Sequence, residues 1–205
     1  MPPRNPFKTV VVTGVPGVGK TTVLSELKRL AQESGVDLVV ANFGDYMLKV
    51  AVARGLVESR DEMRRLPHRV QLDLQELAAR EIVSDAAKRL GQGGVLVVDT
   101  HSVVKTSSGY WPGLPEHVVS ALNPDSIVLI EADPEEILAR RESDASRRRS
   151  DVGSSPEALR ELMHMARVAA MSSAVLTASS VFIVVNPQGR PEEAAAKILE
   201  LVASL

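Results

Sequence analysis

The chain has 205 residues, of which 44% are hydrophobic and 24% charged, the composition of an ordinary globular protein. Its formal net charge of -2 gives no reason to expect nucleic acid or an anionic membrane as a partner, and the absence of cysteine excludes disulfides and thiolate metal sites. We expect one cytoplasmic domain over residues 1–205, because the sequence shows neither a signal-peptide core nor an apolar run of membrane-spanning length.

The first predicted element is a buried strand, Val10–Val12, that leads into a glycine-rich loop with the spacing of a P-loop. Its glycines let successive backbone N–H groups converge on one phosphate, and a helix that begins near Lys20 adds the positive end of its dipole. Lys20 can then reach the terminal phosphates, and the Thr21 hydroxyl can bind Mg²⁺. The loop therefore predicts a bound nucleoside triphosphate. The residues expected to contact it are Gly14, Val15, Pro16, Gly17, Val18, Gly19, Lys20, Thr21 and Thr22.

The segments that follow alternate between helical and extended patterns. Helices are predicted over 21–33, 45–54, 59–66 and 70–90, and from near Pro134, Pro156 and Pro191. Further buried strands are predicted over 36–41, 95–99, 126–131 and 181–186. Continuous apolar strands that alternate with helices predict an α/β P-loop NTPase fold, with a five-stranded parallel sheet flanked by helices.

Polar residues follow several of these strands, at the sheet edge where ligands bind in such folds. Asp99 ends an apolar run in the manner of a carboxylate that acts on magnesium, directly or through water. A helix cap or a turn is the alternative role for Asp99. His101 could contact a phosphate acceptor or be a hydrogen-bonded structural residue.

A cluster of arginines follows the fourth of the five strands. Arg140 and Arg141 come near the end of the helix from Pro134, and three more arginines occupy 147–149 among small, turn-prone residues. A solvated helix end or a basic nucleic-acid patch are the alternatives, and the second is disfavoured because no aromatic residues are interleaved. Phosphoryl transfer needs cations around the transferred oxygens and exclusion of water. We therefore expect a lid, over about 141–155, in which at least two of the arginines act in catalysis.

These features together resemble an adenylate kinase of the archaeal type, a P-loop nucleoside monophosphate kinase. The resemblance covers the chain from the first strand to the last helix, and its most specific parts are 99–102 and 109–115. It implies the reaction ATP + AMP ⇌ 2 ADP with Mg²⁺, ATP and AMP as partners, and a homotrimer. The residues that carry it are the P-loop, Asn42-Phe43-Gly44, Arg60–Leu66, Val98–Ser102, Lys105-Thr106 and Gly109–Pro115.

The resemblance also implies roles for individual residues. The catalytic residues would be Lys20, Arg140, Arg141, Arg147 and Arg149. Asn186, Gln188 and Gly189 would belong to a loop against the adenine of ATP. An AMP-binding insertion over about 42–70 would supply most of the acceptor site. The residues assigned to AMP are Asn42, Phe43, Gly44, Arg60, Arg64, His101 and Lys105, and Arg65 competes with these cations for the AMP phosphate.

The chemistry of the acceptor separates the main alternatives. An AMP phosphate is largely ionised at neutral pH, since its second pKa is about 6, so it needs cations and no general base. A hydroxyl acceptor, as in a shikimate-type kinase, would favour a positioned Asp, and Asp45 stays a candidate for it. A GTP switch protein would carry an Asn-Lys-x-Asp signature, which is absent. A kinase for another monophosphate, or a nucleotide-dependent assembly or RNA-processing factor, stays an open alternative.

Overall fold

Five parallel strands form the centre of the molecule in a computed structural model that describes residues 3–106, 108–143 and 155–205. The strand order is β2-β3-β1-β6-β7, and each neighbouring pair is parallel. The strands are β1 (Lys8–Thr13), β2 (Leu38–Asn42), β3 (Val95–Asp99), β6 (Ser126–Glu131) and β7 (Ser180–Val185). The predicted five-stranded parallel sheet is confirmed.

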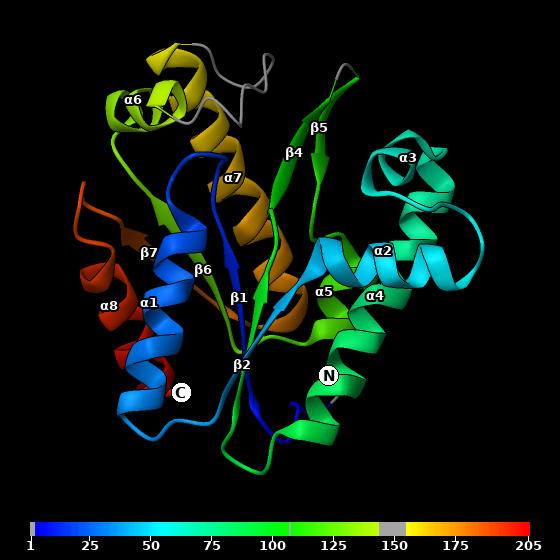
Figure 1. Ribbon diagram of the computed structural model, residues 1–205, viewed down its shortest axis with the longest axis horizontal. Coiled ribbons are helices and arrows are strands. Elements are labelled where there is room, and N and C mark those ends of the chain that lie inside the picture. The colour runs from blue at the N-terminus through cyan, green and yellow to red at the C-terminus, as the bar shows by residue number, and fades with distance from the viewer. Residues whose placement is uncertain (1–2, 107, 144–154) are drawn as a thin grey trace.

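Helices cover both faces of the sheet, which Figure 1 shows nearly edge-on. On one side α1 packs against α8, and on the other α4, α5 and α7 follow one another in contact. Their bounds are α1 (Lys20–Glu33), α4 (His68–Arg89), α5 (Glu116–Leu122), α7 (Pro156–Thr177) and α8 (Pro191–Ser204). The starts expected at Pro156 and Pro191 are confirmed, since proline fits the first turn of a helix, where no N–H partner is needed.

The core lies along the three central strands. Val10, Val11 and Val12 of β1 are fully buried, as are Leu96, Val97 and Val98 of β3. These runs are apolar at every position because helices cover both of their faces. The edge strands β2 and β7 are only partly buried. The central strands therefore provide a rigid base, and the loops at their carboxyl ends are positioned by it.

Three further helices follow the carboxyl ends of strands: α2 (Phe43–Ala53) and α3 (Arg60–Arg65) come after β2, and α6 (Pro134–Ser143) comes after β6. The Asn42 side chain caps α2 by accepting a hydrogen bond of 3.1 Å from the Asp45 N–H. Ser59 caps α3 in the same way, through the Glu62 N–H at 3.3 Å. Both turns are therefore fixed by side chains that the sequence places at the cap positions.

A two-stranded antiparallel hairpin and helix α5 are the elements that the sequence did not predict. The hairpin consists of β4 (Val103–Thr106) and β5 (Gly109–Pro112), four residues each, too short for a periodic pattern. The Trp111 ring lies against the His68 ring at the start of α4, with centroids 3.9 Å apart. On the other side the Tyr110 hydroxyl donates to Glu161 of α7 at 2.9 Å. The hairpin thus joins the start of α4 to α7.

Glycine is required where this hairpin returns to the segment after β3. The Gly113 N–H donates to the Ser102 carbonyl at 2.8 Å. A β-carbon at Gly113 would lie 1.9 Å from the His101 carbonyl oxygen, so any other residue would force the two chains apart. The most specific block of the sequence, 109–115, therefore contains a residue that is needed for packing of the backbone.

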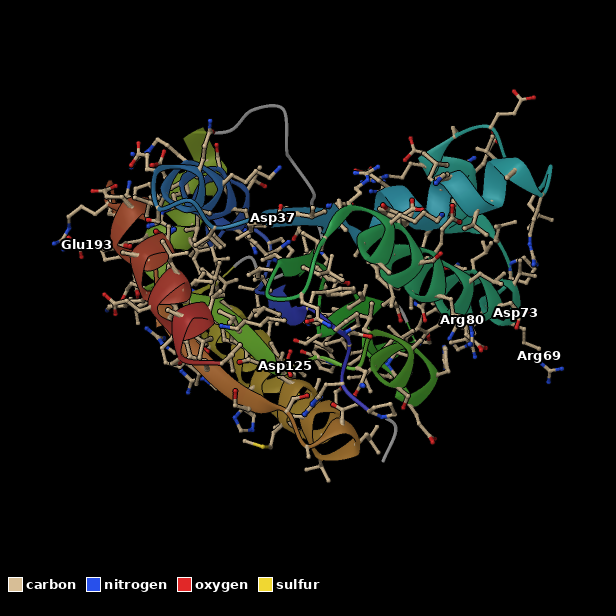
Figure 2. All side chains as sticks on the ribbon, turned by 90° about the horizontal axis from the view of Figure 1, so that it is seen from below. Asp37, Arg69, Asp73, Arg80, Asp125 and Glu193 are labelled. Atoms are coloured by element: carbon tan, nitrogen blue, oxygen red, sulfur yellow. The ribbon has the colours of Figure 1, made fainter. Side chains whose placement is uncertain are left out.

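The two ends of the sheet differ in the loops that they carry. Figure 2 shows the molecule from below, with Asp37 and Asp125 labelled, which come just before β2 and β6. The opposite end carries the loop between β1 and α1, helix α6 and the hairpin, as Figure 1 shows. Among the described residues, no helix is both long and apolar enough to span a membrane.

Candidate functional site

The loop between β1 and α1 has the conformation that its glycines were expected to allow. Gly17 and Gly19 have φ angles of 93° and 87°, in the left-handed region that other residues avoid. A β-carbon at Gly14 would lie 2.6 Å from the Ile130 carbonyl oxygen of β6, so the loop follows the sheet closely. Helix α1 begins at Lys20, the start that the sequence predicted. The loop therefore combines tight turns with a helix N-terminus, which is the arrangement of an anion site.

Three polar side chains meet beside this loop at the ends of β2 and β3. The Lys20 ammonium forms an ion pair with Asp99, and the Asn42 amide donates to the second Asp99 oxygen at 2.8 Å. Asn42 and Asp99 are direct neighbours in the register of the two strands. The Lys20 and Asp99 side chains are 13% and 12% exposed, so this is a largely desolvated pair. The structure therefore brings together a cation, a carboxylate and an amide that lie far apart in the sequence.

Helix α6 places two arginines against the backbone of the glycine-rich loop. The Arg140 guanidinium donates to the Val18 carbonyl at 3.0 Å, and the Arg141 Nε donates to the Pro16 carbonyl at 3.1 Å. Burial lowers the pKa of the Arg141 guanidinium from its ordinary value, although an arginine stays charged at neutral pH. Both cations thus lie within reach of the loop in which the sequence predicts phosphate.

The segment after β7 completes this side of the site. Gln188 accepts a hydrogen bond of 2.5 Å from the Arg140 Nε, and the Asn186 carbonyl accepts one of 3.3 Å from the same guanidinium. Asn186 also donates from its side chain to the Val18 carbonyl at 2.7 Å. Asn186 follows β7, which ends one residue earlier than the predicted strand. The loop assigned to adenine is thus joined to both α6 and the glycine-rich loop.

The residues expected on the acceptor side lie around the start of α2. Arg60 forms an ion pair with Asp45, and its guanidinium nitrogen lies 3.3 Å from where a Gly44 β-carbon would be. The Phe43 side chain is buried in the core. The exposed Arg64 instead pairs with Asp61, three residues earlier on α3. Arg60, rather than Arg64, is therefore the arginine that the structure brings to the Asn42-Phe43-Gly44 segment.

His101 and Lys105 lie beyond β3, on the loop that leads into the hairpin. The His101 Nδ1 lies 3.1 Å from the Gly14 carbonyl, which can only accept, so Nδ1–H is the donor in this hydrogen bond. Lys105 is on β4, with its ammonium 5.5 Å from the centre of the Tyr110 ring. His101 thus contacts the glycine-rich loop, and Lys105 points along the hairpin.

Most of the predicted lid, including Arg147 and Arg149, lies outside the described residues. Within the described part, Glu136 is a residue that the sequence reasoning missed. It pairs with Arg140 at 3.0 Å from the preceding turn of α6. The i, i+4 spacing of Glu136 and Arg140 on a predicted helix was the signal that could have identified it.

Few protein side chains around the glycine-rich loop could supply oxygen ligands to a divalent cation. Among the described residues, no group of three or more His, Cys, Asp or Glu side chains could hold a metal by itself. Thr21, in the first turn of α1, and Asp99, at the end of β3, are the two oxygen ligands that the sequence predicted. Mg²⁺ keeps several waters and is usually bound through one or two carboxylates together with substrate phosphates. The residues present therefore fit Mg²⁺ that arrives with a nucleotide.

Comparison with known proteins agrees with this geometry. A family model described as an AAA domain matches residues 13–160. The chain is 48% identical over 193 residues to an adenylate kinase of Saccharolobus solfataricus, covering 94% of this chain and 98% of that protein. It is 46% identical to an adenylate kinase of Methanopyrus kandleri, over 96% of this chain and 98% of that protein. It is 43% identical to an adenylate kinase of Methanocaldococcus jannaschii, over 95% of this chain and 98% of that protein.

Proposed function

The chain belongs to the adenylate kinase family and is a nucleoside monophosphate kinase, and from this premise we propose that it transfers the terminal phosphoryl group of Mg²⁺-bound ATP to AMP. The observation that carries the proposal is the meeting of the glycine-rich loop with Lys20, Asp99 and the two arginines of α6. This combination provides backbone N–H groups and cations around one position, as phosphoryl transfer requires.

The donor phosphates are proposed to lie over the loop 14–19 and the start of α1. Backbone N–H groups of the loop would bind the phosphate oxygens, and the dipole of α1 adds positive potential. Lys20 would move from Asp99 to the terminal phosphates when the nucleotide enters, since a phosphate offers it more negative charge. Asp99 is then released toward the cation, with Asn42 still holding its second oxygen.

Mg²⁺ is part of the same proposal. Thr21 and Asp99 would hold it, Asp99 directly or through water, with the remaining ligands from ATP and solvent. When bound, the cation neutralises charge on the phosphates and so favours attack by another anion. The Lys20–Asp99 pair supports this assignment, because it shows the carboxylate turned toward the phosphate loop rather than away from it.

The transfer itself needs no proton acceptor on the protein. An oxygen of the AMP phosphate forms the new bond to the γ-phosphorus while the bond to the β,γ-bridging oxygen breaks, which leaves two molecules of ADP. The AMP phosphate is largely ionised at neutral pH, since its second pKa is about 6. The barrier comes from repulsion between two anions, which Lys20, Arg140 and Arg141 are placed to reduce.

AMP is proposed to bind on the side of α2 and α3. Asn42, Gly44 and Arg60 lie together there, and the ion pair of Arg60 with Asp45 supports a role for this arginine in holding the acceptor phosphate. His101, Lys105, Phe43 and Arg64 stay predictions as AMP contacts. The insertion of about 42–70 as an AMP-binding unit, the lid of about 141–155 and a cytoplasmic location likewise stay predictions.

The choice of acceptor gives the direct test of this function. With ATP and Mg²⁺, the purified protein is expected to form ADP at least about tenfold faster with AMP than with CMP, UMP or dTMP, because a pocket that hydrogen-bonds one base leaves polar groups unpaired with another. A coupled assay for ADP measures this, and chelation of Mg²⁺ with EDTA should abolish the activity. Faster turnover of another monophosphate would assign the chain to that acceptor, and an absence of acceptor-dependent ADP would overturn the kinase proposal.

A homotrimer is the proposed assembly, and an apolar stripe on α7 supports association of the chain with copies of itself. Val168, Met171 and Val175 are exposed at helical spacing, Val175 to 74%. Exposed apolar side chains in such a row are typical of a surface that is covered by a partner.

Sedimentation equilibrium is expected to give the mass of three chains for the native protein and a lower mass for Val175→Asp. A charge buried in an apolar interface costs several kcal/mol unless it is paired, which would dissociate the subunits. Leu205→Asp, at another exposed apolar residue, is the matched control and should keep the native mass. A single-chain mass for the native protein would contradict the trimer.

A further inference from the structure

Asn186 is a buried polar residue whose side chain is directed at the glycine-rich loop. Its exposed fraction is 4%, and its amide donates to the Val18 carbonyl at 2.7 Å. The amide nitrogen lies only 2.5 Å from where a Gly19 β-carbon would be. The close approach of the two segments therefore depends on glycine at 19, and this side chain contacts the loop backbone rather than open solvent.

The backbone of Asn186 is anchored independently of its side chain. Its N–H donates to the Glu131 carbonyl at the end of β6, at 2.7 Å. The Glu131 carboxylate is itself held by two hydrogen bonds from Arg167 of α7, of 2.7 and 2.5 Å. Asn186 thus extends from the rigid edge of the sheet, and its side chain reaches the loop from a fixed base.

Holding the Val18 carbonyl fixes the direction of the next N–H group. The Val18 carbonyl and the Gly19 N–H belong to one trans peptide unit, so they point in opposite directions. Asn186 and Arg140 hold that carbonyl from the side of α6 and β7. The Gly19 N–H therefore points away from Asn186 and Arg140, and we take this as the direction from which a phosphate oxygen would accept it.

The other end of the Asn186 carboxamide shows that this orientation is maintained at a cost. Among the described residues, its Oδ1 is one of three buried side-chain atoms without a hydrogen-bond partner. A buried acceptor without a partner is unfavourable, and natural proteins keep few of them. The carboxamide therefore keeps its donor on Val18 even though its acceptor has no partner in return.

We propose that Asn186 is a positioning residue of the donor site, which holds the Val18 peptide so that the Gly19 N–H is preset for a phosphate oxygen of ATP. Its side chain acts through the loop backbone and does not touch the nucleotide. This role differs from the adenine contact that the resemblance implies for Asn186. Since it concerns the donor nucleotide, it rests on the proposed adenylate kinase activity.

The test compares Asn186→Ala and Asn186→Asp with the native protein. Loss of one preset N–H contact should raise both KM and Kd for ATP about tenfold in Asn186→Ala, the equivalent of one net hydrogen bond. Asn186→Asp keeps the volume but places an oxygen against the Val18 carbonyl, so it should raise both values further, about 100-fold. The KM for AMP should change less than twofold in either variant. Titration calorimetry with ATP gives Kd, and the coupled assay gives kcat and both KM values.

Asn123→Gly is the matched control, at another buried asparagine. The Asn123 amide donates to the Pro3 carbonyl at 2.9 Å, just after α5, and its φ of 46° suits glycine. It should lower Tm without changing Kd or KM for ATP. Because Asn186→Asp preserves volume, it keeps the test available if Asn186→Ala fails to fold.

Two results separate this role from its alternatives. If the Asn186 variants lose only thermal stability, with Kd and KM for ATP unchanged, the side chain is structural and the positioning role is wrong. An equal loss for Asn186→Ala and Asn186→Asp would also overturn it, since an oxygen facing the Val18 carbonyl should disturb that peptide more than the absence of the side chain does. If the native protein binds ATP but shows no AMP-dependent turnover, the proposed activity fails, and the calorimetry still decides the role of Asn186.

Discussion

Lys20→Ala is expected to lower kcat/KM for ATP by about 10³-fold, and to lower Tm as well, because it leaves the largely buried Asp99 carboxylate without its cation. Its ammonium forms an ion pair with Asp99 and would stabilise the charge that develops on the transferred oxygens. Removing one preorganised electrostatic group of this kind costs about 10²- to 10³-fold in rate, or about 2.7–4 kcal/mol. The loss should exceed that of any other single substitution here, because Lys20 is charged, largely buried and at the start of α1.

Lys28→Ala is the control for this experiment. Lys28 lies on the same helix with an exposed side chain. Its variant should retain native kinetics, since a solvated lysine eight residues from the loop cannot contact the phosphates. Steady-state kinetics with varied ATP measures both variants, and thermal unfolding confirms that they are folded. If Lys20→Ala retained more than half of native kcat/KM, the assignment of the loop to the donor phosphates would be wrong.

Arg140→Ala should lower kcat/KM by about 10²-fold, the lower end of the effect expected for one electrostatic donor. Within the part of the chain that the structure describes, the guanidinium contacts Val18, Gln188, Glu136 and the Asn186 carbonyl. Its loss removes a cation beside the glycine-rich loop and one hydrogen bond to the Val18 carbonyl, which Asn186 still holds. Arg140→Lys keeps the charge but cannot reproduce the fork of donors, so it should recover only part of the activity.

Arg160→Ala is the control for Arg140→Ala. Arg160 lies on α7 and forms an exposed ion pair of 2.8 Å with Glu135 of α6. Exposed pairs contribute about 0–1 kcal/mol to stability, so the variant should stay folded and active. Single-turnover measurements of ADP formation compare the three arginine variants. If Arg140→Ala kept native turnover, the role of Arg140 would be limited to stabilising the local fold.

The sequence was sufficient for the layers of the fold and for the conformation of the glycine-rich loop between β1 and α1. Val10–Val12 and Val95–Val98 are apolar without interruption, and only a strand covered on both faces needs that pattern. The spacing of Gly14, Gly19 and Lys20 likewise has few structural solutions. Both signals are local, which is why the parallel sheet and the start of α1 at Lys20 are confirmed.

Contacts between segments that are distant in the chain could not be predicted from the sequence. The sequence did not reveal that Asn42 donates to Asp99, because this contact requires β2 and β3 to be neighbours and the order of the strands cannot be read from either residue. The sequence analysis missed the hairpin β4–β5, because its two strands have only four residues each. Strands this short, with glycine and proline among and beside them, show no alternation of apolar and polar residues. The assignment of Asn186 to a loop against adenine comes from the resemblance and stays a prediction. Its side-chain contact with Val18 depends on the packing of β7 beside β6, which the sequence does not show.

The contact between the Trp111 and His68 rings, which are tilted by 42°, gives the molecule a built-in spectroscopic reporter. The chain contains one tryptophan, so its indole fluorescence comes from a single position, where the hairpin meets the start of α4. A ring 3.9 Å away controls the environment of that indole. Any change in the separation of the hairpin from α4, as nucleotides bind, will therefore alter the emission without a chemical label.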